Sequence, residues 1–139
     1  MKTLLLVLAV VGFSLQPLLA QNTVVKQVPV RSTSTMEGPE LYAEYCAVCH
    51  GKDGKGGGPA AVALKQQPAD LTQLARKHSG KLDELRVLNV ITGEDVVAAH
   101  GSRDMPTWGA VFASMSTNES TRKLRVNSLL RYVQSLQVK

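Results

Sequence analysis

Apolar residues recur every three or four positions in three stretches of the chain, residues 38–50, about 82–92 and about 116–136. This spacing brings the apolar side chains onto one face of a helix, so each stretch is predicted to form an amphipathic helix. The apolar positions are Leu41, Tyr45 and Val48 in the first stretch, Leu82, Leu85, Leu88 and Ile91 in the second, and Leu124, Leu130 and Val133 in the third. The pattern predicts an all-α fold with three main helices joined by short turns.

Residues with known preferences for helix ends flank these stretches. Pro39 suits a first helical turn, and Gly51 is expected to end the first helix. Gly93 is expected to end the second helix in the same way. Ser116 and Glu119 have the spacing of a capping box at the start of the third helix.

The first twenty residues have the features of a secretory signal peptide. Lys2 precedes an apolar run over residues 4–13, and Ala20 offers a small residue for cleavage. The run is shorter than a membrane-spanning helix requires, and an uncleaved anchor is the alternative. We therefore expect residues 1–20 to be removed from a protein that is periplasmic or otherwise exported and has no stable membrane insertion after cleavage.

The rest of the chain divides into a leader and one domain. Residues 21–36 mix β-branched residues, serine and threonine without a helical period, so they are expected to form a flexible or extended leader. Residues 37–139 are enough for one folded domain and too few for two.

The motif that carries chemistry is Cys46-Ala47-Val48-Cys49-His50, at the end of the first predicted helix. It contains the only two cysteines of the chain and one of its three histidines. Positions three and four apart share a helix face, so both thiols and the imidazole are expected to point the same way. A C-x-x-C-H run is typical of covalent c-type haem attachment, in which the thiols bond to the haem and the histidine binds the iron.

Three other uses of this motif are less well supported. A zinc site needs about four ligands, but the remaining histidines, His78 and His100, lie far apart and no third cysteine exists. A thioredoxin-like redox pair would need a neighbouring βαβ pattern. A disulfide between residues three apart would be strained and would close almost no loop. Unpaired thiols in an exported protein are expected to oxidise unless they are used, and haem attachment uses them.

Composition agrees with a haem-containing core and a moderately basic surface. Aromatic residues make up only 4% of the chain, and a buried porphyrin would supply the missing apolar volume. The 16 lysine and arginine residues exceed the 11 acidic residues, a balance too mild to indicate nucleic-acid binding. It fits a surface that docks on acidic redox partners, for which Lys52, Lys55 and Lys65 are candidates.

An iron bound by one histidine has a second axial position to fill. Pro106 disfavours helix at the residue before it, which leaves the side chain of Met105 free to turn inward. The side chains with suitable donor atoms are Met36, Met105, Met115, His78 and His100.

The chain resembles the class I c-type cytochromes over about residues 36–137, and the haem-attachment motif at residues 46–50 is the first ground for this. Gly38 and Tyr42 match the glycine and the aromatic residue that stand eight and four residues before the first haem cysteine in that family. This glycine lets the first and last helices of the family cross closely. The run Met105-Pro106-x-Trp108 matches the way in which relatives present an axial methionine.

The resemblance implies a cytochrome c-like fold around one covalently attached haem c. Cys46 and Cys49 would carry the thioether bonds, and His50 and Met105 would be the axial iron ligands. A backbone carbonyl in the stretch around Pro59 would hold the other ring nitrogen of the histidine.

The resemblance leaves three residues around Met105 open. His100 is the alternative sixth ligand. The indole of Trp108 could reach a haem propionate or belong to the core, and Arg103 could face a propionate or be solvated.

A haem with both axial positions filled exchanges single electrons, so the expected function is that of an exported monohaem electron carrier between redox proteins, and not that of an enzyme. Two alternatives stay open. The chain could be the haem subunit of a larger oxidoreductase, or a ligand-binding or peroxidatic haem protein with a labile sixth ligand.

Overall fold

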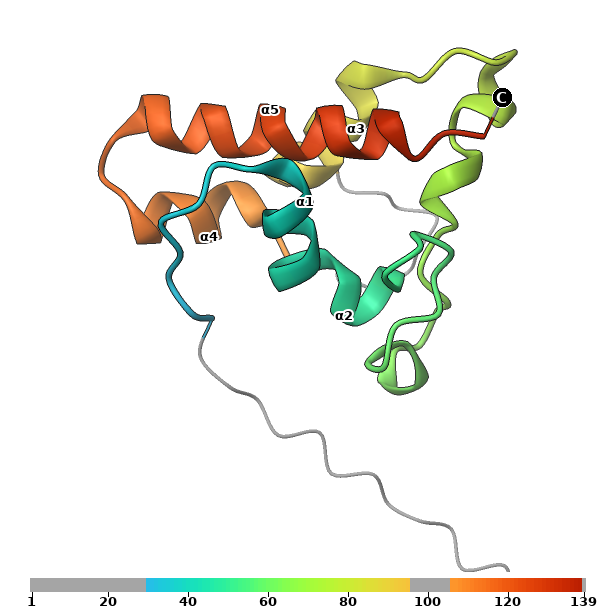
Figure 1. Ribbon diagram of the computed structural model, residues 1–139, viewed down its shortest axis with the longest axis horizontal. Helices are drawn as coiled ribbons and strands as arrows, with labels where there is room; N and C mark the ends of the chain where they lie inside the picture. Colours follow the sequence, from blue (N-terminus) through green and yellow to red (C-terminus); the bar gives the residue numbers. More distant parts are fainter. Residues whose placement is uncertain (1–29, 96–105, 139) are drawn as a thin grey trace, which may run out of the picture.

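The computed structural model describes residues 30–95 and 106–138, in which every regular element is helical and no strand occurs (Figure 1). Its α-helices are α1 (Gly38–Leu41), α2 (Ala47–His50), α3 (Glu84–Thr92), α4 (Trp108–Met115) and α5 (Glu119–Ser135). The shorter elements are the π-helical turn η1 (Tyr42–Cys46), which joins α1 to α2, and the 3-10 turns η2 (Ala61–Ala63), η3 (Leu71–Gln73) and η4 (Ala75–His78). The predicted all-α fold is confirmed.

The first and last helices cross at the start of α1 (Figure 1). A Cβ atom on Gly38 would lie 2.3 Å from the carbonyl oxygen of Ser128 and 3.0 Å from the Cβ atom of Tyr132. Only a residue without a side chain lets the backbone of α1 come this close to α5. Beside the crossing, the rings of Tyr42 and Tyr132 pack with their centroids 4.9 Å apart. The close crossing expected at Gly38 is therefore present.

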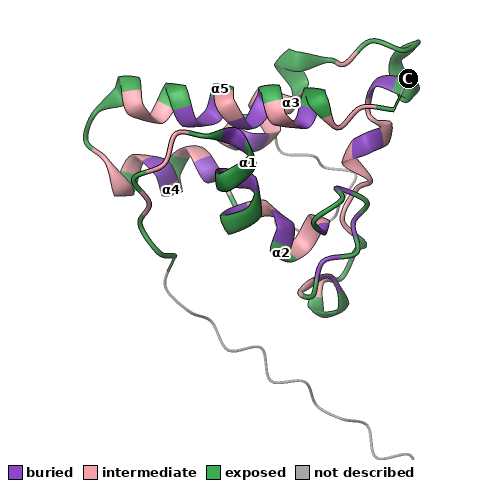
Figure 2. Ribbon diagram, viewed as in Figure 1, coloured by how far each residue is buried: buried purple, intermediate pink, exposed green. Residues whose placement is uncertain are grey.

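The hydrophobic core lies between α1, η1, α4 and α5, where buried segments of these elements face one another (Figure 2). Its most completely buried large side chains are Leu41, Tyr42, Phe112 and Leu129, none of which is more than 2% exposed. Each such side chain contributes roughly 1.5–3 kcal/mol relative to an exposed one. Ile91 adds α3 to the same core. These contacts fix the start of the cysteine-containing stretch against the C-terminal helix.

Helix α3 begins and ends close to its predicted limits. The side chain of Asp83 caps its start by accepting a hydrogen bond from the backbone N–H of Arg86 at 3.0 Å. Gly93 ends the helix in the left-handed region, with φ of 83°, as the sequence predicted.

The apolar face predicted for α3 is partly wrong. Leu85 is 68% exposed, whereas Ile91 is buried and Val87 and Leu88 pack against the core. Residues 87, 88 and 91 lie within about 100° of one another around a helix, and residue 85 lies outside that arc. The face of α3 that packs on the core therefore does not include Leu85, in the first turn.

The C-terminal part of the chain differs from the prediction at three points. Helix α4 was not expected, because its sequence, WGAVFASM, is apolar at most positions and lacks a clear polar face. The N-cap of α5 is Asn118, whose side chain accepts from the N–H groups of Ser120 and Thr121, so the capping box predicted at Ser116 is wrong. Leu124 is 57% exposed, since the buried face of α5 runs through Val126, Leu129, Leu130 and Val133.

The π-helical turn η1 changes the register of the first helical stretch. A π turn contains one more residue than an α turn, so the residues that follow are rotated by about 100° relative to an unbroken α-helix. Val48, predicted on the apolar stripe, is accordingly 44% exposed, and Ala47 is buried in its place. The π turn ends at Cys46, the first residue of the motif.

Residues 30–37 lead into α1 without regular secondary structure and pass beside α4 and α5 (Figure 1). This described part of the expected leader is hydrogen-bonded to Arg125 of α5 and to Tyr45 of η1. The signal sequence expected at residues 1–20 lies outside the described residues. Within residues 30–95 and 106–138, no helix is long and apolar enough to span a bilayer.

Candidate haem site

Both cysteines and the histidine of the motif lie on the last two helical turns of the first helical stretch. Cys46 ends the π turn, and Cys49 and His50 end α2. All three side chains are partly exposed, and neither thiol is in a disulfide. Gly51 follows with φ of 78°, so the chain turns away from the helix immediately after the histidine, as the sequence predicted.

The imidazole of His50 is held by one backbone hydrogen bond. Its Nδ1 atom lies 3.1 Å from the carbonyl oxygen of Ala69. A carbonyl only accepts hydrogen bonds, so Nδ1 carries the ring hydrogen and Nε2 keeps its lone pair. Burial lowers the pKa of His50, while the Ala69 hydrogen bond opposes that shift. The neutral ring with Nε2 available is the form that binds a metal.

This acceptor corrects the expectation for Pro59. The histidine is held by the carbonyl of Ala69, and not by a carbonyl of the stretch around Pro59, whose side chain is exposed. A Cβ atom on Gly56 would lie 2.3 Å from the carbonyl oxygen of Pro68, so residues 68–69 run directly beside the glycine-rich loop. That packing brings the next carbonyl, that of Ala69, to the imidazole.

The glycine-rich loop binds the end of α2 through its backbone. The N–H groups of Gly56, Gly58 and Ala60 donate to the carbonyls of residues 50, 49 and 48 at 2.8, 3.0 and 2.9 Å. The last carbonyls of a helix have no hydrogen-bond partner within the helix. Here every second residue of the loop donates its N–H group to one of them. A Cβ atom on Gly58 would lie 2.4 to 2.6 Å from backbone atoms of three motif residues, so the loop could not approach as closely with a side chain there.

Tyr42 connects the core to the end of the motif. Its hydroxyl donates to the carbonyl of Gly51 at 2.8 Å, and its ring lies in the core. Burial raises the pKa of Tyr42 well above its ordinary value, so the hydroxyl stays protonated and remains a donor. Tyr42 therefore fixes the turn that follows His50.

Both thiols are protonated at neutral pH in this environment. Burial, with the neighbouring thiol as a smaller cause, raises the pKa of Cys46 to about 12. Burial also raises the pKa of Cys49. Among the residues that the structure describes, no group of three or more histidine, cysteine or acidic side chains is arranged to hold a metal ion.

Of the other candidate ligands, Met105 and His100 lie outside the described residues, as does Arg103. Met36 is partly exposed in the segment that precedes α1. The sulfur of Met115 lies 3.9 Å from the hydroxyl of Tyr45 and packs at the edge of the core, and His78 is exposed at the end of η4.

Trp108 belongs to the aromatic core. It is 7% exposed, and its ring centroid lies 5.5 Å from that of Tyr45 and 6.0 Å from that of Phe112. Of the two roles left open for it, the structure thus shows packing.

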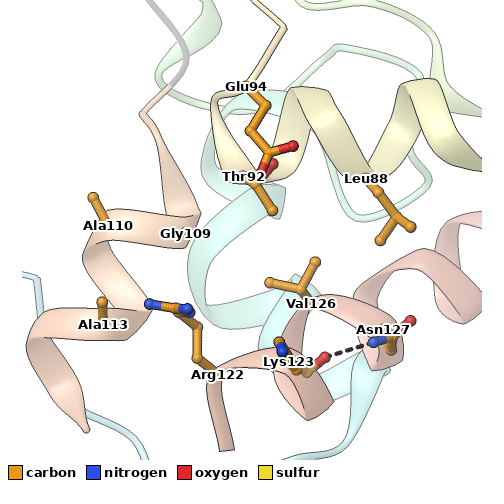
Figure 3. A pocket seen from close by; sticks show the side chains of 10 residues that line it. All are labelled: Leu88, Thr92, Glu94, Gly109, Ala110, Ala113, Arg122, Lys123, Val126 and Asn127. Atoms are coloured by element: carbon orange, nitrogen blue, oxygen red, sulfur yellow. Dashed lines mark hydrogen bonds between the residues drawn. The ribbon is translucent and has the colours of Figure 1, made fainter. Parts of the chain in front are cut away.

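A groove of about 470 Å³ lies on another part of the molecule, between α3, α4 and α5 (Figure 3). Leu88 and Val126 line it together with small residues of α4, and Glu94 and Arg122 stand at its sides. No residue of the Cys46–His50 motif lines it, so it is separate from that motif.

The arrangement fits a c-type haem. The structure offers two thiols, an imidazole whose distal nitrogen is available, and a neighbouring loop that holds the helix end through backbone groups. An all-α fold whose first and last helices cross beside such a motif defines a c-type cytochrome domain.

The comparison with known families agrees. Residues 33–119 match the family model described as cytochrome c oxidase, cbb3-type, subunit III, and the chain belongs to this family. Membership implies haem c as the cofactor and redox proteins as partners, in a family named for an oxidase complex. No similar protein was found among the curated proteins, and no similar structure among the solved ones.

Proposed function

We propose that the chain is an exported c-type cytochrome with one covalent haem, which carries single electrons between redox proteins and is not itself an enzyme. Cys46 and Cys49 would form the thioether bonds, and His50 would be the proximal ligand. The observation that best supports this proposal is the hydrogen bond from Nδ1 of His50 to the carbonyl of Ala69, because it fixes the tautomer that an iron ligand needs.

The protein groups around the motif would keep the site rigid. The carbonyl of Ala69 orients the imidazole, and the backbone of residues 56–60 holds the helix end that carries Cys49 and His50. The haem, when bound, supplies exchange between the ferric and ferrous states. A site whose protein groups are already held in place needs little rearrangement for that exchange.

We further propose Met105 as the sixth ligand, with His100 as the alternative. Pro106 biases Met105 away from helix, and α4 begins two residues after this proline. Trp108, at the start of α4, is buried against Tyr45, so the chain is anchored three residues after the methionine. A thioether ligand favours the ferrous form and raises the reduction potential.

The decisive experiment combines haem staining on a denaturing gel with the ferric spectrum of Met105→Ala and of a matched control, Met115→Ala. We expect covalent haem in the wild type and in both variants. Met105→Ala should lose the low-spin spectrum, bind carbon monoxide rapidly when reduced, and have a much lower potential. Met115→Ala should keep the wild-type ligation, since its sulfur contacts the hydroxyl of Tyr45.

Two results would contradict parts of the proposal. An unstained wild-type protein would exclude covalent haem attachment. A high-spin wild-type spectrum, with rapid carbon monoxide binding, would instead support the ligand-binding or peroxidatic alternative.

The family match favours a second possibility, in which the same haem domain works as a subunit of a larger oxidoreductase. Lys52, Lys55 and Lys65 are exposed near the motif and are our candidates for docking on an acidic partner surface. Purification from native membranes and soluble extract would distinguish the two roles. A free carrier is expected alone in the soluble fraction, and a subunit is expected with stoichiometric partner chains.

We also propose the domain limits used above. Residues 1–20 would be the signal peptide, residues 21–36 the leader and residues 37–139 the cytochrome domain. Intact mass of the purified protein would locate the cleavage site and count the haem groups.

A further inference from the structure

Gln137 is a partly buried polar side chain that the proposed function does not use, and it follows directly after the C-cap of α5. Its Nε2 atom donates to the carbonyls of Leu71 and Val133, both at 2.7 Å. Its Oε1 atom accepts from the backbone N–H of Ala75 at 2.9 Å. Both N–H groups and the oxygen of the amide are therefore used. They join the end of α5 to the turns η3 and η4, beside which the last described residues run (Figure 1).

The residues on either side of Gln137 contact the same part of the chain. The backbone N–H of Val138 donates to the carbonyl of Thr72 at 3.0 Å, and Thr72 is only 6% exposed. The side chain of Leu136 packs against the core, and a Cβ atom on Gly54 would lie 3.1 Å from it and 3.5 Å from the methyl group of Thr72. We name residues 136–138 the α5 tail.

The segment that the α5 tail holds carries the hydrogen-bond acceptor of the haem-site histidine. The carbonyl of Ala69, which lies 3.1 Å from Nδ1 of His50, stands two residues before Leu71. The N–H of Leu71 donates to the carbonyl of Gly54 in the glycine-rich loop at 2.7 Å. Leu71 is therefore bonded to the loop through its N–H and to Gln137 through its carbonyl, close to the group that holds the imidazole.

The position of the Ala69 carbonyl relative to α2 depends on bonds that reach beyond η3. At the start of this turn, the side chain of Asp70 accepts from the N–H of Thr72 at 2.9 Å and from its hydroxyl at 2.6 Å. These local bonds shape the turn but do not join it to other elements. The bonds to Gly54 and to Gln137 do so, and each therefore restrains the carbonyl that faces the imidazole.

We infer that Gln137 is a positioning residue for the haem: by binding the carbonyl of Leu71 it keeps the carbonyl of Ala69 on His50, and it thereby lowers the reduction potential. A hydrogen bond from Nδ1 makes the imidazole a more basic ligand, and a more basic ligand favours ferric iron. Release of the Ala69 carbonyl would therefore raise the potential. The inference rests on the proposed function, in which His50 binds the iron.

The test compares two substitutions of Gln137 with a matched control on the same helix. Gln137→Met keeps the length of the side chain and removes all three hydrogen bonds. Gln137→Glu keeps an oxygen for the N–H of Ala75, but its carboxylate is ionised at pH 7 and cannot donate to the carbonyl of Leu71. The control, Gln134→Met, removes an exposed amide that donates to Glu84 of α3 at 3.2 Å.

Two quantities are measured on the haem-loaded protein at pH 7. The first is the reduction potential. The second is the rate at which the Nδ1 proton of His50 exchanges with solvent, measured by NMR on the ferrous protein. Exchange of this proton reports on its hydrogen bond to Ala69, which a general loss of stability elsewhere would not select.

Both variants of Gln137 are expected to shift the redox equilibrium about threefold toward the ferrous form, because the histidine loses part of its hydrogen bond. The Nδ1 proton should exchange about fivefold faster, as expected when one hydrogen bond no longer supports the acceptor segment. Gln137→Glu should show these changes although it keeps the bond to Ala75, since the bond to Leu71 is the one that acts. Gln134→Met should change neither quantity.

An unchanged potential in both variants of Gln137 would overturn the inference. A raised potential with unchanged exchange at His50 would also overturn it, because Gln137 would then act by another route. Equal changes in Gln134→Met would assign the effect to α5 as a whole. If Gln137→Met does not fold, Gln137→Glu decides between these outcomes. Absence of covalent haem from the wild type would instead overturn the proposed function, and this inference with it.

Discussion

The two ends of the first helical stretch are held by different forces. At its start, α1 packs on α5 through side chains, and the core residues there are almost completely buried. At its end, α2 is held mainly by backbone hydrogen bonds from the glycine-rich loop, and Cys46, Cys49 and His50 stay partly exposed.

The difference indicates that the contacts that stabilise the fold are largely separate from those that position the Cys46–His50 motif. At the helix crossing, the burial of apolar side chains stabilises the fold. Backbone pairing at the motif fixes the position of the helix end and leaves Cys46, Cys49 and His50 only partly buried. The following substitutions test whether the two ends are as independent as this comparison indicates.

The largest effect is expected for Gly58→Ala, at the loop end. The new Cβ atom would lie 2.4 to 2.6 Å from backbone atoms of α2, which cannot move without breaking the helix end. We expect a loss of about 3 kcal/mol in the free energy of unfolding and much less covalent haem per folded molecule. Denaturant unfolding and quantitative haem staining measure these two quantities.

Gly57→Ala is the matched control for that experiment. A Cβ atom at Gly57 would meet nothing within 4 Å, so its stability should stay within about 0.5 kcal/mol of the wild type. Equal losses in both variants would show that the loop needs glycine for chain flexibility and not for close approach to α2.

A smaller effect is expected for Gly38→Ala, at the crossing end. Its Cβ atom would lie 2.3 Å from the carbonyl oxygen of Ser128, so α1 and α5 would have to separate. We expect a loss of about 2 kcal/mol in denaturant unfolding, with normal haem staining of the molecules that fold. Staining reduced as strongly as in Gly58→Ala would mean that the two ends are not independent.

The smallest effect is expected for Tyr42→Phe, which removes the one hydroxyl that connects the ends. The ring stays in the core, but the carbonyl of Gly51 loses the hydroxyl donor and keeps only the N–H of Gly54, at 3.2 Å. A loss of about 1 kcal/mol in the free energy of unfolding is expected. The thermal midpoint should fall slightly while the ferric spectrum stays unchanged, and a change of iron ligation would give this hydroxyl a larger role.

The features that follow from local preferences were predictable from the sequence. Gly51 and Gly93 end their helices with positive φ because glycine adopts this conformation without strain. The close crossing at Gly38 follows from the position of this glycine before the cysteines. These features need only the residue itself and its place in a pattern.

The features that depend on backbone geometry or on tertiary contacts were not predictable. The carbonyl of Ala69 can be supplied by any residue type, so no sequence pattern distinguishes it from a carbonyl near Pro59. Asn118 and Ser116 are both good N-caps, and only the start of α5 decides between them. Arginine is usually found at the surface, and Arg125 is buried because the chain before α1 packs on it and accepts its hydrogen bond at Thr33.

In the π turn at Tyr42–Cys46, the number of residues matters to the structure as well as their identity. Deleting one residue from it would restore an ordinary α-helix and turn the motif by about 100° relative to α1. Leu41, in the core before the turn, and Cys49 and His50 after it would then no longer keep their present relative orientation, although every chemical group was retained. Insertions and deletions here should therefore be tolerated less well than substitutions, because the number of residues between Tyr42 and Cys46 sets the direction in which the motif faces.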